Sequence, residues 1–199
     1  MTMGTFKYGT EQLTAGKALQ IARGESRGKL GRICRQKVRK SRSIVKRLAN
    51  GTEAVYGINT GFGPLCDTMI SAEDTSKLQY NILKSHSVGV GNPMPKEIAK
   101  LMLILKMQSL AQGFSGIALT TLERIQWHIE NDIIPIVPEK GSVGASGDLA
   151  PLAHLFLPLI GLGEVWYKGK IVPTKKVFKK EGLQSITLGA KEGLALING

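Results

Sequence analysis

Three consecutive residues, Ala145-Ser146-Gly147, have the types needed to build a reactive ring from their own backbone. Gly147 has no side chain, so its amide nitrogen can approach and attack the carbonyl carbon of Ala145. Loss of the Ser146 hydroxyl as water would then leave an exocyclic methylidene carbon. The product would be a conjugated, electron-poor ring, a stronger electrophile than any ordinary side chain.

The residues around this triad predict a tight turn that leads into a helix. Residues 141–147 contain three glycines and two serines, and an apolar run follows. Asp148 is a suitable N-cap, Pro151 is tolerated in a first turn, and the helix is expected to reach about Ile160. A helix N-terminus there would stabilise negative charge on the ring. Ala-Ser-Gly alone is usually an ordinary glycine-rich turn, and a phosphate-binding loop is disfavoured because no Lys-Ser/Thr pair follows.

Two further segments could contribute to a site. Residues 55–63 read Val-Tyr-Gly-Ile-Asn-Thr-Gly-Phe-Gly, which predicts a shaped loop of the kind that often covers a site. An ordinary surface turn with a buried Tyr56 is the alternative. A capping-box-like start at Ser71 and Asp74 predicts a helix to about Ser87, with His86 at its C-terminal end. Taken alone, such a histidine is usually a partner of the helix dipole.

These segments, together with Leu-Ala-Leu-Ile-Asn-Gly at residues 194–199, resemble the signatures of the aromatic amino acid ammonia-lyases. Within that family they are most similar to the enzymes that act on histidine. The resemblance runs from about Leu13 to the last residue and is loosest over the first fifty residues. Two long signatures occurring in the right order make a chance match very improbable.

The resemblance implies a role for each site residue. Ala145, Ser146 and Gly147 would form the methylidene-imidazolone prosthetic group of the family, with no metal or nucleotide cofactor. Tyr56 would be the general base, on a lid loop that reaches the prosthetic group of a neighbouring subunit. His86 would bind the substrate side chain, and Asn198 would lie beside the prosthetic group and the bound amino acid. The family assembles as homotetramers.

The implied reaction is the non-oxidative deamination of L-histidine to trans-urocanate and ammonia. A phenylalanine or tyrosine ammonia-lyase, or an aminomutase with the same prosthetic group, is the alternative within the family. His86 argues against that alternative because the phenylalanine and tyrosine enzymes typically carry a different pattern at this position.

Charge suggests a different class of function. The chain has 199 residues and a formal net charge of +12, much of it within residues 27–47. A truncated, non-catalytic fragment could bind a polyanion through this basic face. A solvated helix face is the simpler interpretation, because no aromatic residues interleave with the charges. We therefore expect no nucleic-acid partner.

Composition and cysteine usage fit a cytoplasmic protein. Hydrophobic residues make up 42% of the chain. The most apolar run, residues 149–162, is interrupted by Pro151, His154 and Pro158 and is too short to span a membrane. Cys34 and Cys66 lack metal-ligand spacing, and free thiols in a reducing compartment are the simplest interpretation.

Periodicity predicts a mainly α chain with one small β hairpin at residues 164–172, around Lys168-Gly169. A short helix capped by Thr14 and a long helix over residues 30–49 are expected first. Residues 98–110 are apolar nearly all round, which predicts a helix buried in a bundle. We assign residues 1–199 to one N-terminal ammonia-lyase domain. We expect the family's C-terminal helical part, and with it a complete active site, to lie outside this chain.

Overall fold

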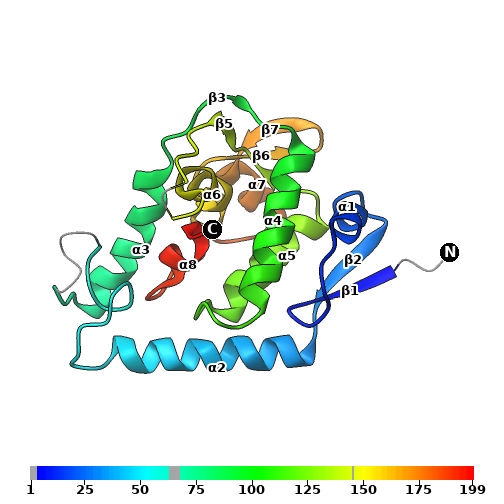
Figure 1. The fold of residues 1–199 in the computed structure, drawn as a ribbon. Helices are drawn as coiled ribbons and strands as arrows, with labels where there is room; N and C mark the ends of the chain where they lie inside the picture. The colour runs from blue at the N-terminus through cyan, green and yellow to red at the C-terminus, as the bar shows by residue number, and fades with distance from the viewer. Residues whose placement is uncertain (1–3, 63–67, 145) are drawn as a thin grey trace.

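A computed structural model describes residues 4–62, 68–144 and 146–199 and confirms the mainly α fold (Figure 1). The helices are α1 (Ala15–Ala22), α2 (Arg32–Ala49), α3 (Ala72–His86), α4 (Lys96–Ala111), α5 (Leu119–Glu130), α6 (Leu149–Phe156), α7 (Thr174–Glu181) and α8 (Glu192–Ile197). A 3-10 turn, Leu157–Ile160, extends α6 to the predicted end at Ile160. The strands are β1 (Gly4–Tyr8), β2 (Ser26–Leu30), β3 (Val90–Pro93), β4 (Ile134–Pro135), β5 (Pro138–Lys140), β6 (Glu164–Tyr167) and β7 (Lys170–Pro173).

Helix α4 forms the centre of the packing. It contacts α1, α2, α5 and α6, and its inward face contributes fully buried side chains to the core: Leu103, Ile104, Met107 and Leu110. Helices α3, α6 and α8 form a second group whose members all contact one another. Figure 1 shows α6 and the end of α8 between α3 and α4. The described residues of loop 141–147, which we call the triad loop, precede α6 and therefore lie where the two groups meet.

Two of the three N-caps predicted from the sequence form their capping hydrogen bond. Thr14 Oγ1 accepts a hydrogen bond from the Lys17 amide at 3.2 Å, and Ser71 Oγ accepts one from the Asp74 amide at 3.0 Å, as predicted. Asp148 occupies the N-cap position of α6, but its side chain makes no capping bond. The expected cap is therefore wrong, because the Asp148 carboxylate instead accepts a hydrogen bond from the Ser142 hydroxyl.

A parallel pair of strands, β1 and β2, was not anticipated from the sequence. Helix α1 connects them, and Phe6 and Tyr8 point inward with their rings edge to face, 5.4 Å apart. Leu30 belongs to β2, so the long helix begins at Arg32, two residues later than predicted. The strands pack closely at Gly28, where an added Cβ would lie 2.2 Å from the Tyr8 ring.

The predicted hairpin is present, with β6 antiparallel to β7 around Lys168-Gly169. Strand β4 adds to β6, which gives a three-stranded sheet in the order β4-β6-β7. A separate antiparallel pair, β3 and β5, joins the segment after α3 to the segment before the triad loop. Through this pair, the end of α3 at His86 is held close to the loop.

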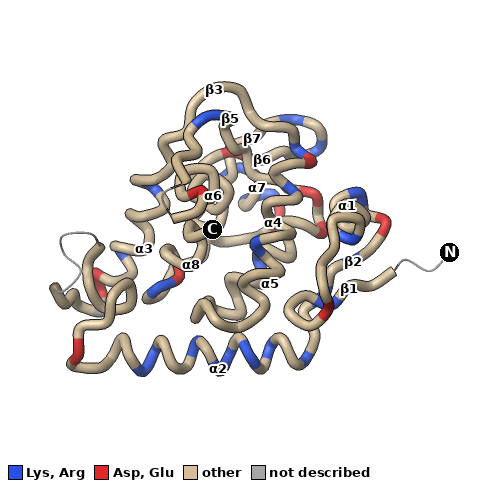
Figure 2. The backbone as a smooth tube through the Cα atoms, in the orientation of Figure 1, with Lys and Arg blue, Asp and Glu red and all other residues tan. Residues whose placement is uncertain are grey.

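Two surface features differ from the simplest expectations. Helix α4 is not buried on all sides within the described residues, because Ile98 and Leu105 are 46% and 56% exposed. Lysine and arginine residues recur along α2 (Figure 2), but two of them pair with acids from other helices, Arg35 with Glu123 and Arg42 with Glu192. No helix among the described residues is long and apolar enough to cross a membrane.

Candidate active site

The described part of the triad lies where the N-terminus of α6 meets the end of α8. Gly147 has a φ of 79°, in the left-handed region that favours glycine. A Cβ at this position would lie 2.6 Å from the Cα of Gly199, so the two backbones touch where a side chain cannot fit. Ala145, the first member of the triad, lies outside the described residues.

Ser146 and Asn198, fifty-two positions apart in the chain, are hydrogen-bonded to each other. The Ser146 hydroxyl donates to Oδ1 of Asn198 at 3.1 Å. The Gly199 amide donates to the Ser146 carbonyl at 3.3 Å, and the Asn198 amide donates to the Leu194 carbonyl at 3.1 Å. The end of α8 therefore holds Ser146 through both its side chain and its backbone.

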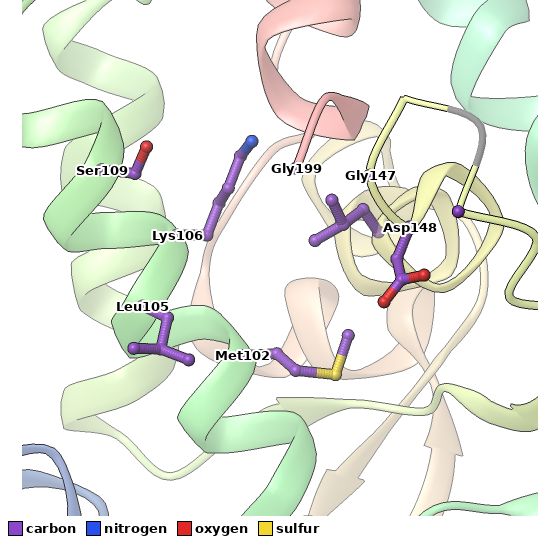
Figure 3. A pocket seen from close by; sticks show the side chains of 9 residues that line it. Met102, Leu105, Lys106, Ser109, Gly147, Asp148 and Gly199 are labelled. Carbon is purple, nitrogen blue, oxygen red and sulfur yellow. The ribbon is translucent and has the colours of Figure 1, made fainter. Parts of the chain in front are cut away.

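Two cavities flank the triad loop, and Gly144 and Gly147 line both of them. The first, which we call the lysine cavity, has a volume of about 440 Å³ and is shown in Figure 3. Its other lining residues are Met102, Leu105, Lys106, Ser109, Asp148, Leu152 and Gly199. The second, the histidine cavity, has a volume of about 190 Å³. Its other lining residues are Ser85, His86, Val88, Gly141, Val143, Leu149 and Ala150.

His86 reaches the histidine cavity from the last turn of α3. Its Nδ1 lies 2.9 Å from the Ile82 carbonyl oxygen and 3.1 Å from Ser85 Oγ. Because a carbonyl can only accept, the Ile82 contact favours a proton on Nδ1 and leaves Nε2 as the acceptor in the neutral ring. The structure thus brings His86 to the cavity beside the triad loop, with a defined ring orientation.

Among the predicted site residues that the structure describes, Tyr56 is the one that does not lie at the triad loop. Its side chain is 56% exposed, its ring packs edge to face with Phe62 at 6.1 Å, and it is not among the lining residues of either cavity. The segment that carries it is partly outside the described residues, from Gly63 onward.

Lys106 was missed by sequence reasoning. It extends from α4 into the lysine cavity, and its ammonium donates a hydrogen bond to the main-chain carbonyl of Asn198. Burial lowers the pKa of Lys106 to about 8. The only sequence signal was a lone charge within the apolar segment 101–107, which is easily taken for a solvated position.

The described residues fit a backbone-derived prosthetic group. Gly147 provides the close backbone approach that ring closure needs, and Ser146 presents the hydroxyl that must leave. The N-terminus of α6 and the Lys106 ammonium both supply positive potential beside the loop. Within the described ranges, no three His, Cys, Asp or Glu side chains are grouped closely enough to hold a metal ion.

The chain is similar to proteins of one known family. The family model described as "Aromatic amino acid lyase" matches residues 13–199. Histidine ammonia-lyase of Myxococcus xanthus is 47% identical over 189 residues, which cover 95% of this chain and 37% of the relative. The chain thus spans a little over one third of the length of the curated relatives it matches.

Solved structures show the same fold. The crystal structure of histidine ammonia-lyase from Trypanosoma cruzi superposes with a TM-score of 0.89 at 33% identity, covering 98% of this chain and 38% of that one. Tyrosine aminomutase from Streptomyces globisporus gives the same TM-score and identity, covering 98% of this chain and 36% of that one. Structural similarity therefore does not distinguish a histidine ammonia-lyase from a tyrosine aminomutase.

Proposed function

The chain belongs to the aromatic amino acid lyase family, and we propose that it supplies the prosthetic-group loop of an enzyme that deaminates L-histidine to trans-urocanate and ammonia. The observation that carries the proposal is the placement of Ser146. Its hydroxyl donates a hydrogen bond to the Asn198 side chain. The loop that carries Ser146 also lines the histidine cavity, where His86 lies.

We propose that the loop makes its own cofactor. The Gly147 nitrogen forms a bond to the Ala145 carbonyl carbon, and the displaced oxygen leaves as water with the amide hydrogens of Gly147 and Ser146. A second water then forms from the Ser146 hydroxyl and its α hydrogen, which leaves the methylidene double bond. The group supplies an electrophile that turns the substrate amine into a good leaving group.

The remaining roles follow from where each side chain lies. His86 would hold the imidazole of the substrate in the histidine cavity, with Nε2 accepting the ring N–H. Asn198 would hold the serine hydroxyl before ring formation and bind the finished group or the amino acid afterwards. Tyr56 would remove the β proton. Because Tyr56 lines neither cavity, we propose that it acts on the loop of a neighbouring subunit in a homotetramer.

Similarity to a tyrosine aminomutase keeps one alternative open, a family member that acts on a different aromatic amino acid. The curated bacterial relatives named histidine ammonia-lyase are 42–47% identical to this chain, whereas the aminomutase and the Trypanosoma cruzi histidine ammonia-lyase are each 33% identical. The higher identities favour histidine as the substrate. The cytoplasmic location and the absence of a nucleic-acid partner stay predictions.

A Ser146→Ala variant tests the proposal in the natural protein that carries this chain. Wild-type protein is expected to weigh two waters less than its encoded mass and to produce urocanate from L-histidine. The variant is expected to keep its helical content, to keep its full encoded mass and to lose nearly all turnover. Full activity in the variant, or an unprocessed but active wild type, would contradict the proposal.

A further inference from the structure

We propose that Lys106 is a positioning residue for formation of the prosthetic group, because it fixes the backbone of Asn198 and thereby aims the Asn198 side chain at Ser146. The inference rests on the proposed function of the triad. It concerns a residue on α4, a helix that carries none of the signatures described above.

Lys106 is a buried residue of α4. Its side chain lies on the face of α4 that borders the lysine cavity, between Met102 and Ser109, and only 8% of the residue is exposed. Figure 3 shows it extending from α4 toward the segment that ends at Gly199. Its ammonium donates to the main-chain carbonyl of Asn198.

The contacts form a continuous path from α4 to the triad. Lys106 holds the Asn198 carbonyl, and Asn198 Oδ1 accepts from the Ser146 hydroxyl at 3.1 Å. The next residue, Gly199, donates its amide to the Ser146 carbonyl at 3.3 Å and packs its backbone against Gly147. A shift of the Asn198 carbonyl would therefore also move the Asn198 side chain and the Gly199 amide, which both hold Ser146.

A second buried lysine on the same helix shows that Lys106 is unusual. Lys100 is equally buried, but its ammonium lies 2.8 Å from a carboxylate oxygen of Asp132, which offsets the cost of burying the charge. The acceptor found for Lys106 is a neutral carbonyl, and burial lowers the pKa of Lys106. A charge retained in a cavity at such a cost indicates a use at the site rather than a contribution to stability.

The charge also explains why lysine suits this place. A hydrogen bond from an ionised donor is roughly twice as strong as one between neutral groups, so it fixes a carbonyl more tightly. The α8 helix that precedes Asn198 has only six residues, Glu192–Ile197, and provides little rigidity by itself. An anchor from the long helix α4 supplies that rigidity.

The experiment measures how fast the protein loses the two waters of prosthetic-group formation, not how fast it turns over histidine. The natural protein that carries this chain is made by cell-free synthesis as wild type, Lys106→Met, Lys106→Gln, Lys106→Arg and Lys100→Met. Intact mass is measured at successive times after synthesis is stopped. Lys100→Met is the matched control, because it removes an equally buried lysine of the same helix that lines neither cavity beside the loop. Circular dichroism and thermal unfolding are recorded for each variant.

Lys106→Met is expected to lose its two waters about 100-fold more slowly, the cost of misplacing a reacting group by roughly 1 Å. Lys106→Arg is expected to restore most of the rate, and Lys100→Met to process like wild type even if it unfolds at a lower temperature. Should Lys106→Met fail to fold, Lys106→Gln takes its place. It is also expected to slow water loss, because its shorter, neutral amide fixes the Asn198 carbonyl less tightly than an ammonium does.

Water loss at the wild-type rate in Lys106→Met, or in Lys106→Gln where that variant stands in, would overturn the inference. So would normal processing combined with a raised KM for histidine, which would make Lys106 a substrate-binding residue. Equal slowing in Lys100→Met would also overturn it, because the effect would then come from general destabilisation. A wild-type protein that never loses two waters would instead contradict the proposed function, so the two failures are distinguishable.

Discussion

Gly144 and Gly147 both have a backbone φ in the left-handed region, but only Gly147 lies against another backbone segment. Gly147 lies against Gly199, whereas an added Cβ at Gly144 would have no atom within 4 Å. Gly147→Ala is therefore expected to abolish water loss, because the new methyl group would push Ser146 away from Asn198. Gly144→Ala, the control, carries only the backbone cost of about 1–2 kcal/mol for a left-handed alanine and should still be processed. Intact mass checks both, and processing in Gly147→Ala would contradict the argument.

His86 is expected to set the preference for histidine. In His86→Leu, the substrate imidazole would lose a hydrogen-bond acceptor, which should lower kcat/KM for histidine about 10- to 100-fold. Turnover of phenylalanine should fall less or rise. The neighbouring Ser85→Ala variant, which leaves the imidazole in place, serves as control. An unchanged ratio of kcat/KM for histidine to kcat/KM for phenylalanine would show that His86 does not recognise the substrate side chain.

His128 should make stability depend on pH. Its ring is fully buried, Nδ1 lies 2.8 Å from the Ile133 carbonyl, and burial lowers its pKa to about 4. The unfolded chain binds a proton near pH 6.5, whereas the folded one does not. Stability should therefore be lost as pH falls from 6.5 toward 4, by up to about 3 kcal/mol. Urea unfolding at several pH values measures this loss, and His128→Gln should flatten the slope. An equal slope in the variant would assign the loss to other groups.

At the scale of helices and strands, the sequence was most informative where one residue type determines the backbone. Thr14 and Ser71 marked helix starts correctly, and Lys168-Gly169 marked the turn of the hairpin. Strands β1 and β2 gave no such signal, because each has five residues and places lysine or arginine on its exposed face. Their pairing depends on packing of Phe6 and Tyr8 against the core, which is a tertiary effect.

Glu192 connects three helices and should be the costliest acid to remove. Its carboxylate accepts hydrogen bonds from the Ala118 amide at 3.0 Å, the Thr121 hydroxyl at 2.7 Å and the Gly189 amide at 2.9 Å. It also pairs with Arg42 of α2 at 3.4 Å. Glu192 is buried, so α2, α5 and α8 share one acceptor inside the protein.

Glu192→Ala is expected to destabilise the chain by about 3–5 kcal/mol, because it leaves the largely buried Arg42 without its carboxylate partner and two amides without their acceptor. Glu123→Ala is the control. It breaks the partly exposed pair with Arg35 and should cost at most about 1 kcal/mol. Denaturant unfolding compares the two. Similar losses would mean that the Glu192 cluster adds nothing beyond an ordinary surface pair.

At the scale of the whole molecule, the candidate site was only partly readable from the sequence. The resemblance predicted that Ser146 and Asn198 share a site, and the structure brings them into contact. The contact of Lys106 with the Asn198 carbonyl could not be predicted, because it depends on which face α4 turns toward the site and on where α8 ends. The predicted role of Tyr56 is different in kind, because it involves the loop of a neighbouring subunit and therefore depends on more than one copy of the chain.

The exposed side of α4 carries a largely apolar stripe. Ile98, Met102, Leu105 and Ser109 are spaced to share one stripe of the helix, and three of them border the lysine cavity. Leu105 is 56% exposed there, and Val143 of the triad loop is 86% exposed. An apolar surface of this kind beside a site is typical of a contact with another chain or segment.

The 199-residue chain in isolation should therefore self-associate, and Leu105→Glu should raise its monomer fraction by placing a charge in the contact. Ile33→Glu is the matched control, because Ile33 is 59% exposed on α2 and does not belong to the α4 stripe. Sedimentation velocity over a range of concentrations measures both variants. If Ile33→Glu disrupted association and Leu105→Glu did not, the contact would lie on α2, and the lysine cavity would be open to solvent rather than closed by a neighbour.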